Sequence, residues 1–416
     1  MSNLSGVLGD IFLIACLVFL LLASHPFLGY PFSLRLIGAG GRNGGRRDGG
    51  TAKVVPTAAS GLAAEPAWSM PRVALCVCAY NEAAVIERKA RNMLDLRARV
   101  GQLDLLVYVD AASDGTAQLL EPFRDQITVI VSPERRGKTH GMNLLVAQTD
   151  AEVVVFTDAN VMIDPTAIPV MAEYFRDPRV GCVCGHLDYV NDGENATASV
   201  GSAYWRLEEA VKRMESRFGA VMGADGSLFA VRRSLHRTIP ENLIDDMYLS
   251  LSILCDGYQV VSAPDARAYE ESVTSSKEEF RRKVRIACQA FNVHRRLWPR
   301  LAKLSPLVIY MYVSHKLLRW LSAASLVLAA LTGEAALVAY GAPILPSLLL
   351  VPVLLCLLWL AARLGVSKAA TIAEILTSLA GASLGVLDSL RGRQFQTWTP
   401  AASIRRVADT PESPKG

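Results

Sequence analysis

The sequence carries almost no excess charge of either sign. Its 43 Lys and Arg residues nearly balance 39 Asp and Glu residues, which leaves a formal net charge of +4 over 416 residues. A protein that binds nucleic acid needs a basic surface to neutralise the phosphates. We therefore expect no nucleic-acid partner.

Cysteine is also scarce, and the eight residues present are too few for a disulfide scaffold. Cys76 and Cys78, like Cys182 and Cys184, are separated by a single residue inside apolar runs. Zinc sites usually space their cysteines by two or more residues, whereas this alternation places both sulfurs of each pair on one face of a strand. We expect core thiols in a reducing, cytosol-facing compartment.

Two nucleotide-binding signatures are missing. No G-x-G-x-x-G follows the first strand-like run at residues 73–78, and no G-x-x-x-x-G-K-[ST] occurs in the chain. These glycine-rich loops cradle phosphates in dinucleotide-dependent enzymes and in P-loop proteins. Both classes therefore lose their main support.

Apolar residues, in contrast, make up 51% of the sequence and are concentrated near its two ends. Residues 11–30 carry no charge over a length that spans the ~30 Å hydrocarbon core as a helix. Arg35, Arg42 and Arg46 follow, and such a basic flank marks the cytoplasmic side. We expect a transmembrane anchor over residues 1–33, a flexible tether over 34–70 and a cytoplasmic domain at the plasma (inner) membrane.

Three further apolar stretches lie at residues 306–331, 344–364 and 369–390. The last contains Glu374 and Asp388, and basic residues after it favour a cytosolic tail over 393–416. We expect a multi-pass region over 305–392 with two crossings and an interfacial or re-entrant last segment. Residues 276–304 alternate apolar and basic positions at helical spacing, which predicts an amphipathic helix at the membrane surface.

Three ionisable residues, His315, Lys316 and Arg319, interrupt the first of these stretches. They lie within about one helical turn of one another. Charged groups are costly in lipid. We therefore expect them to face headgroups, the catalytic domain or a saccharide path.

The remaining residues, 71–275, have the pattern of an α/β domain. Five β-branched runs, at 73–78, 105–109, 127–131, 153–157 and 180–184, alternate with helical stretches. Ligands of such sheets bind outside the carboxyl ends of the strands. Acidic clusters follow three of the runs, with Glu82 after the first, Asp110 after the second and Asp158 after the fourth. The sequence therefore predicts a binding pocket at this edge.

In their order and spacing these clusters resemble membrane-anchored family 2 glycosyltransferases of the polysaccharide-synthase type. The resemblance covers roughly residues 71–300 and rests on Cys78-Ala79-Tyr80-Asn81-Glu82, Asp110 to Thr116, Arg136-Gly137-Lys138, Thr157-Asp158-Ala159-Asn160 and Asp245-Asp246-Met247-Tyr248-Leu249. It implies an inverting GT-A fold, a Rossmann-like mixed sheet with helices on both faces, carrying transmembrane helices at both ends.

The resemblance also implies a donor site. Tyr80, Glu82 and Asp110 would recognise the nucleoside, and Lys138 would meet the diphosphate. Asp158 and Asn160 would hold Mg²⁺ or Mn²⁺. Asn160 stands where the family has a second carboxylate, so we expect a weaker metal site that depends on the substrate phosphates.

Inversion at the anomeric carbon needs one base, and the family register assigns Asp246, with Asp245 as the alternative. Adjacent residues of a helix do not share a face, so we expect one carboxylate in the cleft and the other outside it. Asp225 and Gly226 resemble an acceptor-side loop. Arg285 keeps the arginine of the family's Q-x-x-R-W motif, although its Gln and Trp are missing here, and would also face the donor diphosphate.

Three functions remain open from the sequence. The first is inverting sugar transfer from a nucleotide-diphosphate sugar, expected to be a UDP-sugar, to a growing exopolysaccharide or lipid-linked glycan. The second is a single addition to a small lipid acceptor, which the altered Q-x-x-R-W position favours. The third is a noncatalytic membrane scaffold that binds nucleotide sugars, and Asp246 argues against it because binding alone needs no base.

Overall fold

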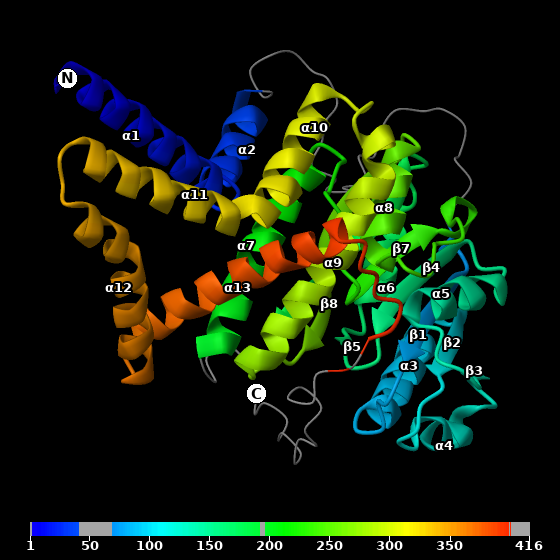
Figure 1. Ribbon diagram of the computed structural model, residues 1–416. Helices are drawn as coiled ribbons and strands as arrows, with labels where there is room; N and C mark the ends of the chain where they lie inside the picture. Colours follow the sequence, from blue (N-terminus) through cyan, green and yellow to red (C-terminus); the bar gives the residue numbers. More distant parts are fainter. Residues whose placement is uncertain (1, 41–68, 192–195, 399, 401–416) are drawn as a thin grey trace, which may run out of the picture.

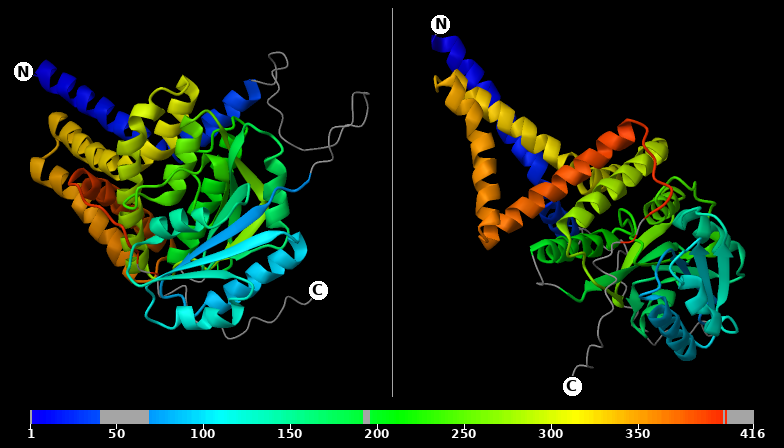
Figure 2. Two further views of the ribbon diagram at one scale, coloured as in Figure 1. Left: turned by 90° about the vertical axis from the view of Figure 1, so that its right-hand side faces the viewer. Right: turned by 60° about the horizontal axis from the view of Figure 1, so that its bottom comes forward.

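The structure, a computed structural model, describes residues 2–40, 69–191, 196–398 and 400. Most of the expected tether and the expected tail beyond residue 400 lie outside these residues. Figure 1 shows an α/β part at one side of the molecule and long helices extending from the other. In both views of Figure 2 the sheet stays on the side away from the N-terminal helix.

Eight strands form one mixed sheet in the order β3-β2-β1-β4-β7-β6-β8-β5. The strands are β1 Val73–Ala79, β2 Leu103–Asp110, β3 Thr128–Ser132, β4 Val153–Asp158, β5 Met162–Ile163, β6 Val180–Tyr189, β7 Leu228–Arg232 and β8 Gln259–Glu270. Strands β3, β2, β1 and β4 are parallel, whereas β7 is antiparallel to both of its neighbours. The five predicted runs are strands β1, β2, β3, β4 and β6, and the carboxyl ends of β1, β2 and β4 meet at one edge.

Alternation along the strands divides the core into two clusters, one on each face of the sheet. Val73, Leu75 and Val77 pack on the face covered by α3 (Ile86–Val100), α4 (Thr116–Leu120) and α6 (Ala167–Tyr174). Cys76 and Cys78 belong to the other cluster, together with residues of α5 (Lys138–Ala147), α7 (Ala196–Ser216), α8 (Asp245–Cys255) and α9 (Ser276–Leu301). Short 3₁₀ turns, Glu121–Phe123 and Arg233–Leu235, complete this part.

The cysteines behave as the alternation predicts. Cys76, Cys78, Cys182 and Cys184 are buried free thiols in a single cluster. The described residues contain no group of three or more His, Cys, Asp or Glu side chains arranged to hold a metal ion.

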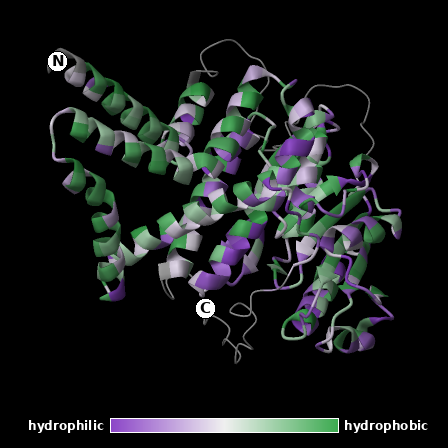
Figure 3. Cartoon of the chain, viewed as in Figure 1, coloured by the Kyte–Doolittle hydropathy of each residue, from purple (hydrophilic) through white to green (hydrophobic). Residues whose placement is uncertain are grey.

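Four helical segments are long and apolar enough to cross a membrane: Ser5–Ser24, Pro306–Ala339, Ile344–Arg363 and Ser367–Leu390. They comprise most of α1 (Ser2–Ser24), then α10 (Pro306–Tyr312), a π-helical turn (Val313–Leu317) and α11 (Leu318–Ala339), and finally α12 (Ile344–Arg363) and α13 (Ser367–Leu390). Figure 3 shows hydrophobic residues predominating around α1, α11 and α12.

One expectation about these segments is corrected. The predicted span over residues 11–30 ends at Ser24, because Pro26 disrupts the helix, and a second helix, α2 (Gly29–Gly40), follows. The last segment, expected to be interfacial or re-entrant, forms a continuous helix of spanning length, and its place relative to the membrane stays a prediction. Its two acidic residues find protein partners, since Glu374 accepts a hydrogen bond from Thr197 and Asp388 pairs with Arg393.

Helix α9, expected to be an amphipathic helix at the membrane surface, packs against both α8 and α13. Arg282 and Arg285 of its polar N-terminal half line a cavity while Arg281 is exposed, and Ala290, Phe291 and Val293 join the core cluster against α8. Helix α13 packs along it on the other side, as Figure 1 shows. The amphipathic pattern therefore indicates a helix that packs between the α/β part and the apolar helices.

Candidate active site

A cavity of about 770 Å³ lies at the carboxyl ends of β1 and β4. Its walls come from both halves of the molecule: from the α/β part, from α9, from the start of α11 and from residues 395–398 and 400 near the C-terminus. We call this cavity the pocket. It is of the size that small-molecule sites in proteins usually have.

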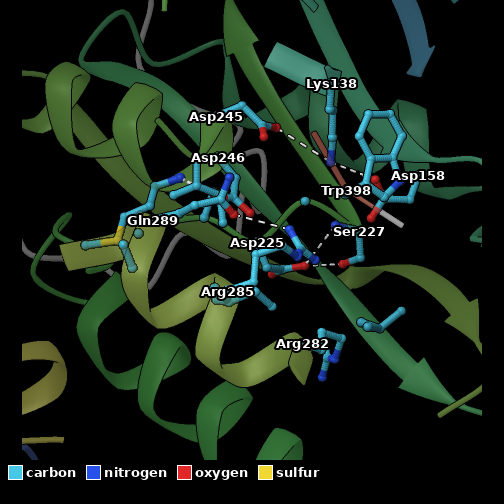
Figure 4. A pocket seen from close by; sticks show the side chains of 18 of the residues that line it. Lys138, Asp158, Asp225, Ser227, Asp245, Asp246, Arg282, Arg285, Gln289 and Trp398 are labelled. Atoms are coloured by element: carbon cyan, nitrogen blue, oxygen red, sulfur yellow. Dashed lines mark hydrogen bonds and ion pairs between the residues drawn. The ribbon is translucent and has the colours of Figure 1, made fainter. Parts of the chain in front are cut away.

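The pocket brings together charged side chains that are far apart in sequence. A Cβ atom placed on Gly226 would lie 2.7 Å from Lys138 Nζ, 3.3 Å from Asp246 Oδ2 and 3.7 Å from Asp158 Oδ2. Lys138 itself, the first residue of α5, donates to Asp158 Oδ1 at 2.6 Å. Figure 4 shows these side chains facing one another. Gly226 is thus the point on which the carboxylates of Asp246 and Asp158 and the ammonium group of Lys138 converge.

Asp245 and Asp246 open α8, and both line the pocket. The expectation that one would point away is therefore wrong. The reason is that Asp245, at the first position of the helix, reaches inward to 3.6 Å from Lys138 Nζ. Burial and the carboxylate of Asp245 raise the pKa of Asp246 to about 7, against the opposing effect of Lys138.

Lys138 remains a cation among these carboxylates. Burial alone would lower its pKa, but the carboxylates of Asp158, Asp245 and Asp246 outweigh burial and raise it. A fixed positive charge between carboxylates is a ready partner for an incoming phosphate.

Arg285 supplies the second cation of this region, from α9. It bonds to Gln289 Oε1 at 3.2 Å and has no carboxylate within ion-pair distance among the described residues. Burial and repulsion from Arg282 lower the pKa of Arg285 to about 10. An anion bound beside it would relieve both effects. Gln289, one turn further along α9, also lines the pocket. The Q-x-x-R-W motif of the family has its glutamine before the arginine, so Gln289 does not occupy the motif position.

The acceptor-side loop contains a carboxylate held by a buried lysine. Asp225 Oδ2 accepts a hydrogen bond from Lys212 Nζ at 2.5 Å, and Lys212 also donates to Glu209 Oε1 at 2.9 Å. Burial alone would lower the pKa of Lys212, but Asp225 and Glu209 raise it well above its usual value. The sequence analysis missed Lys212, because acidic and basic residues at i, i+3 spacing also occur on solvated helix faces.

The residues expected at the nucleoside divide into two groups. Glu82 lines the pocket with 2% of its surface exposed. Asp110 does not line it: its side chain is fully buried and accepts hydrogen bonds from the backbone N–H groups of Arg136 and Gly137 at 2.7 and 3.0 Å. Asp110 therefore lies behind the pocket wall, and its expected contact with a donor stays a prediction. The carboxylate instead shapes the 135–138 loop that presents Lys138.

Tyr80 does not line the pocket either, because two other side chains pack against its ring. The guanidinium of Arg135 lies over its ring at 3.4 Å, and Trp398 approaches the ring edge-on at 6.1 Å between centroids. The backbone at the ends of β1 and β2 is left-handed at Asn81 and Ala111, with φ of 52° and 51°. Such strained conformations in non-glycine residues cluster at functional sites.

The segment after α13, drawn in red in Figure 1, runs beside the α/β part, and its residues 395–398 line the pocket. Gln289 Nε2 donates to the carbonyl of Phe395 at 2.8 Å, Gln396 Nε2 donates to Glu241 at 2.9 Å, and Arg135 donates to the carbonyl of Trp398 at 2.6 Å. We call residues 393–398 the C-terminal strap. It brings an aromatic side chain, Trp398, into the pocket wall beside Tyr80.

Asp158 and Asn160, the residues expected to hold a metal ion, suit a hard divalent cation. Asp158 offers Oδ2, while its Oδ1 is bonded to Lys138. Asn160 donates its amide Nδ2 to Glu270 at 2.8 Å, and this bond leaves the carbonyl Oδ1 as the available ligand. One carboxylate and one amide oxygen suit a hard divalent ion that is carried mainly by the substrate phosphates.

Comparison with known proteins adds a family match. The family model described as "Glycosyltransferase like family 2" matches residues 71–289. The N-acetylglucosaminyltransferase of Rhizobium meliloti (strain 1021) is 27% identical over 285 residues, which cover 64% of this chain and 67% of that protein. The poly-beta-1,6-N-acetyl-D-glucosamine synthase of Staphylococcus aureus (strain COL) is 24% identical over 204 residues, which cover 47% of this chain and 49% of the synthase. The chain thus spans about half the length of the staphylococcal relative.

Among solved structures, the chain resembles the mannosyltransferase PcManGT of Pyrobaculum calidifontis, determined in complex with GDP-Man and Mn²⁺. The TM-score is 0.66 at 22% identity, and the match covers 92% of this chain and 99% of that one. At this identity the likeness establishes the GT-A fold, with its mixed sheet, for the α/β part.

Proposed function

The chain belongs to glycosyltransferase family 2, and from this premise we propose that it transfers a sugar, with inversion, from a nucleoside diphosphate sugar to a growing polysaccharide or a lipid-linked glycan. The relatives named for N-acetylglucosamine transfer make UDP-N-acetylglucosamine the first donor to test. Four helices of spanning length support a membrane enzyme, and the basic residues after the first of them favour a cytoplasmic α/β part.

One observation carries the proposal: Lys138, Asp158 and Asp246 converge on Gly226 inside a single pocket. Sugar transfer with inversion needs a base on one side of the anomeric carbon and a stabilised leaving group on the other. The pocket has a candidate base, Asp246, and a cation, Lys138, within a few ångströms of one point. Both requirements are therefore met inside the pocket itself.

Each residue then has a role. Asp246 takes the proton from the acceptor hydroxyl as that oxygen attacks, and its raised pKa suits a base that works near neutral pH. Lys138 and Arg285 offset the negative charge that develops on the departing nucleoside diphosphate. Glu82 and Tyr80 lie at the nucleoside end, and Asp110 holds the loop that carries Lys138.

A divalent ion, Mg²⁺ or Mn²⁺, belongs to this proposal with Asp158 and Asn160 as its protein ligands. Bound there, it would neutralise diphosphate charge as a Lewis acid. Asp225, Gly226 and Asp245 border the acceptor side, where Lys212 fixes the orientation of the Asp225 carboxylate.

A single addition to a lipid acceptor is the second candidate. Ile286 lines the pocket where processive relatives are expected to present a tryptophan for sugar stacking. An aliphatic side chain there offers no aromatic face to an elongating chain, which favours short products.

The test uses the full chain in membranes or nanodiscs with a panel of radiolabelled UDP- and GDP-sugars and Mg²⁺ or Mn²⁺, followed by sizing of the products. We expect one UDP-sugar to be consumed and its label to appear in a polymer or a glycolipid. A single lipid-soluble product would select the second candidate, and binding of donors without turnover would leave only the scaffold function.

A further inference from the structure

A cluster of basic residues lies at the end of the pocket away from Lys138, and donor chemistry does not use it. The π-helical turn Val313–Leu317 leads into α11 and turns His315, Lys316 and Arg319 toward α7. There they meet one carboxylate, Glu208, which accepts from His315 Nε2 at 3.0 Å, from Lys316 Nζ at 3.2 Å and from Arg319 Nη1. π-Helical turns are rare and occur frequently at functional sites.

The charge of this cluster is incompletely balanced. Three basic side chains share two carboxylates, because Glu208 accepts from all three and His315 also bonds to Glu215 at 2.7 Å. Burial would raise the pKa of Glu208, but the three basic neighbours hold it well below its usual value. Arg319 is only 8% exposed, yet its Nε and Nη2 find no hydrogen-bond partner among the described residues. Buried cationic donors without partners are costly. An added anion would lower that cost.

The cluster is separate from the donor end of the pocket. The loop from Gly223 to Ser227 lies between the two ends. A Cβ on Gly226 would touch Lys138, whereas a Cβ on Gly223 would lie 3.7 Å from Lys316 Cε. Lys138 and Lys316 therefore serve opposite ends of one loop, and that loop carries Asp225.

Basic side chains of α9 continue the cluster. Arg281 and Arg282 line the pocket. Arg282 pairs with Glu279 at 2.8 Å, whereas Arg281 is exposed and has no ion pair among the described residues. Arg281 and Arg282 thus add basic side chains to the same pocket wall, within about one helical turn of Arg285.

We propose that this end of the pocket is an anion seat, formed by Lys316, Arg319, Arg281 and Arg282, which binds the phosphate of a lipid-borne acceptor. Lys316 and Arg319 belong to a helical segment of membrane-spanning length, so a ligand held by them lies next to the bilayer surface. The inference rests on the proposed function and names its acceptor class: a phosphorylated lipid, with Asp225 and Asp246 beyond the phosphate.

The experiment measures equilibrium binding of a radiolabelled polyprenyl phosphate to the full chain in detergent, with the matching polyprenol as the uncharged probe. We expect the phosphate form to bind at least about tenfold more tightly, as charge-assisted hydrogen bonds imply. Lys316→Gln should remove most of that preference and Lys316→Arg should retain it. The matched control is Lys283→Gln, because Lys283 is a similarly half-buried lysine of α9 that pairs with Glu279 at 3.0 Å but does not line the pocket.

Three outcomes would overturn the proposal: equal binding of polyprenol and polyprenyl phosphate, an unchanged preference in Lys316→Gln, or an equal loss in Lys283→Gln. Competition distinguishes the sources of the anion. Displacement of the lipid by millimolar inorganic phosphate or by an acidic oligosaccharide at equal potency would assign the seat to a soluble anion instead. Donor hydrolysis by the unaltered protein is measured separately, so a failure of the proposed sugar transfer is distinguishable from a failure of the seat.

Discussion

Asp246 has an unusual environment for an aspartate, because a second carboxylate and a lysine lie beside it in a half-buried position. We expect Asp246→Asn to lower the transfer rate by roughly 10²–10⁴-fold, which is the usual contribution of a positioned base. Donor affinity should persist because Lys138 and Arg285 remain. Rates with saturating donor, together with a donor titration by calorimetry, check both parts, and unchanged turnover would refute the assignment.

The pH dependence of the reaction follows from the same side chain. A base with a pKa of about 7 is protonated below that pH and cannot accept the acceptor's proton, so the rate should fall as pH drops below 7 and level off above it. Asp245→Asn removes a negative neighbour and should lower the pKa of Asp246, which moves the acid limb to lower pH. An acid limb that stays in place in Asp245→Asn would show that another group controls the profile.

Gly226 allows a sharper test of the pocket itself. Its backbone conformation suits any residue, but the added methyl of Gly226→Ala would lie 2.7 Å from Lys138 Nζ and fill the space where the charged groups converge. We expect near-normal stability with transfer lost by at least about tenfold. Thermal unfolding and rate measurements check this, with Gly38→Ala as the control, since its methyl would meet only Arg217 at 3.9 Å.

At the scale of single residues, the sequence predicts the part of the site that follows strand ends. Glu82, Lys138 and Asp158 line the pocket as their positions after β1, at the start of α5 and at the end of β4 imply. Lys316 stands out in the sequence because it interrupts an apolar stretch, and its contact with Glu208 of α7 fits the expectation that it faces the catalytic domain. Lys212 could not be found from the sequence, because nothing in a local pattern distinguishes a lysine buried against a distant carboxylate, Asp225, from a solvated one.

At the scale of elements, the sheet contains strands that the sequence predicts and a strand, β8, that it does not predict. The apolar runs of β1, β2 and β4 are recognisable because both of their faces are buried. The edge strand β3 is partly exposed and is recognisable by its β-branched residues. Strand β8 escaped prediction because Pro264, Asp265 and Arg267 interrupt its apolar residues, and its register against β6 shifts at two places. Such irregular pairing depends on tertiary contacts that the local sequence does not encode.

The C-terminal strap is the element whose role is easiest to perturb. Gly137 has φ of 92°, and the backbone carbonyl of Gln396 occupies the space that a side chain would need. We therefore expect Gly137→Ala to displace the strap and to cost about 1 kcal/mol or more through its backbone conformation. Hydrogen exchange should become faster at the amides of Phe395 to Trp398.

The displaced strap should also change donor affinity, because Trp398 would leave the pocket wall beside Tyr80. Gly101→Ala provides the control, since Gly101 has a similar φ of 85° with open space around it. If the two variants alter exchange in the strap equally, the contact between Gly137 and Gln396 is not what holds the strap.

At the scale of the whole molecule, Glu215 links the α/β part to the apolar helices. This fully buried carboxylate of α7 accepts from Tyr30 OH of α2 at 2.6 Å, from His315 Nδ1 at 2.7 Å and from the backbone N–H of Met222 at 3.0 Å. Glu215→Ala leaves these three donors unpaired, and we expect a loss of about 3 kcal/mol or more.

Thermal unfolding in detergent checks this expectation. The control is Glu87→Ala, which removes an exposed pair with Arg91 and should change stability by less than about 0.5 kcal/mol. Equal unfolding temperatures for the two variants would show that the halves are held together by apolar packing alone.

The pocket walls come from both the α/β part and the helical part, so a fragment of the chain does not contain the whole pocket. A water-soluble fragment that stops after β8 would retain Lys138, Asp158 and Asp246 but not Arg285 or Lys316, which come from α9 and from the turn before α11. Such a fragment would lack the pocket walls that α9, the start of α11 and the C-terminal strap supply in the intact chain. Inhibitor screens run on it would therefore select compounds for a shape that the native enzyme never presents.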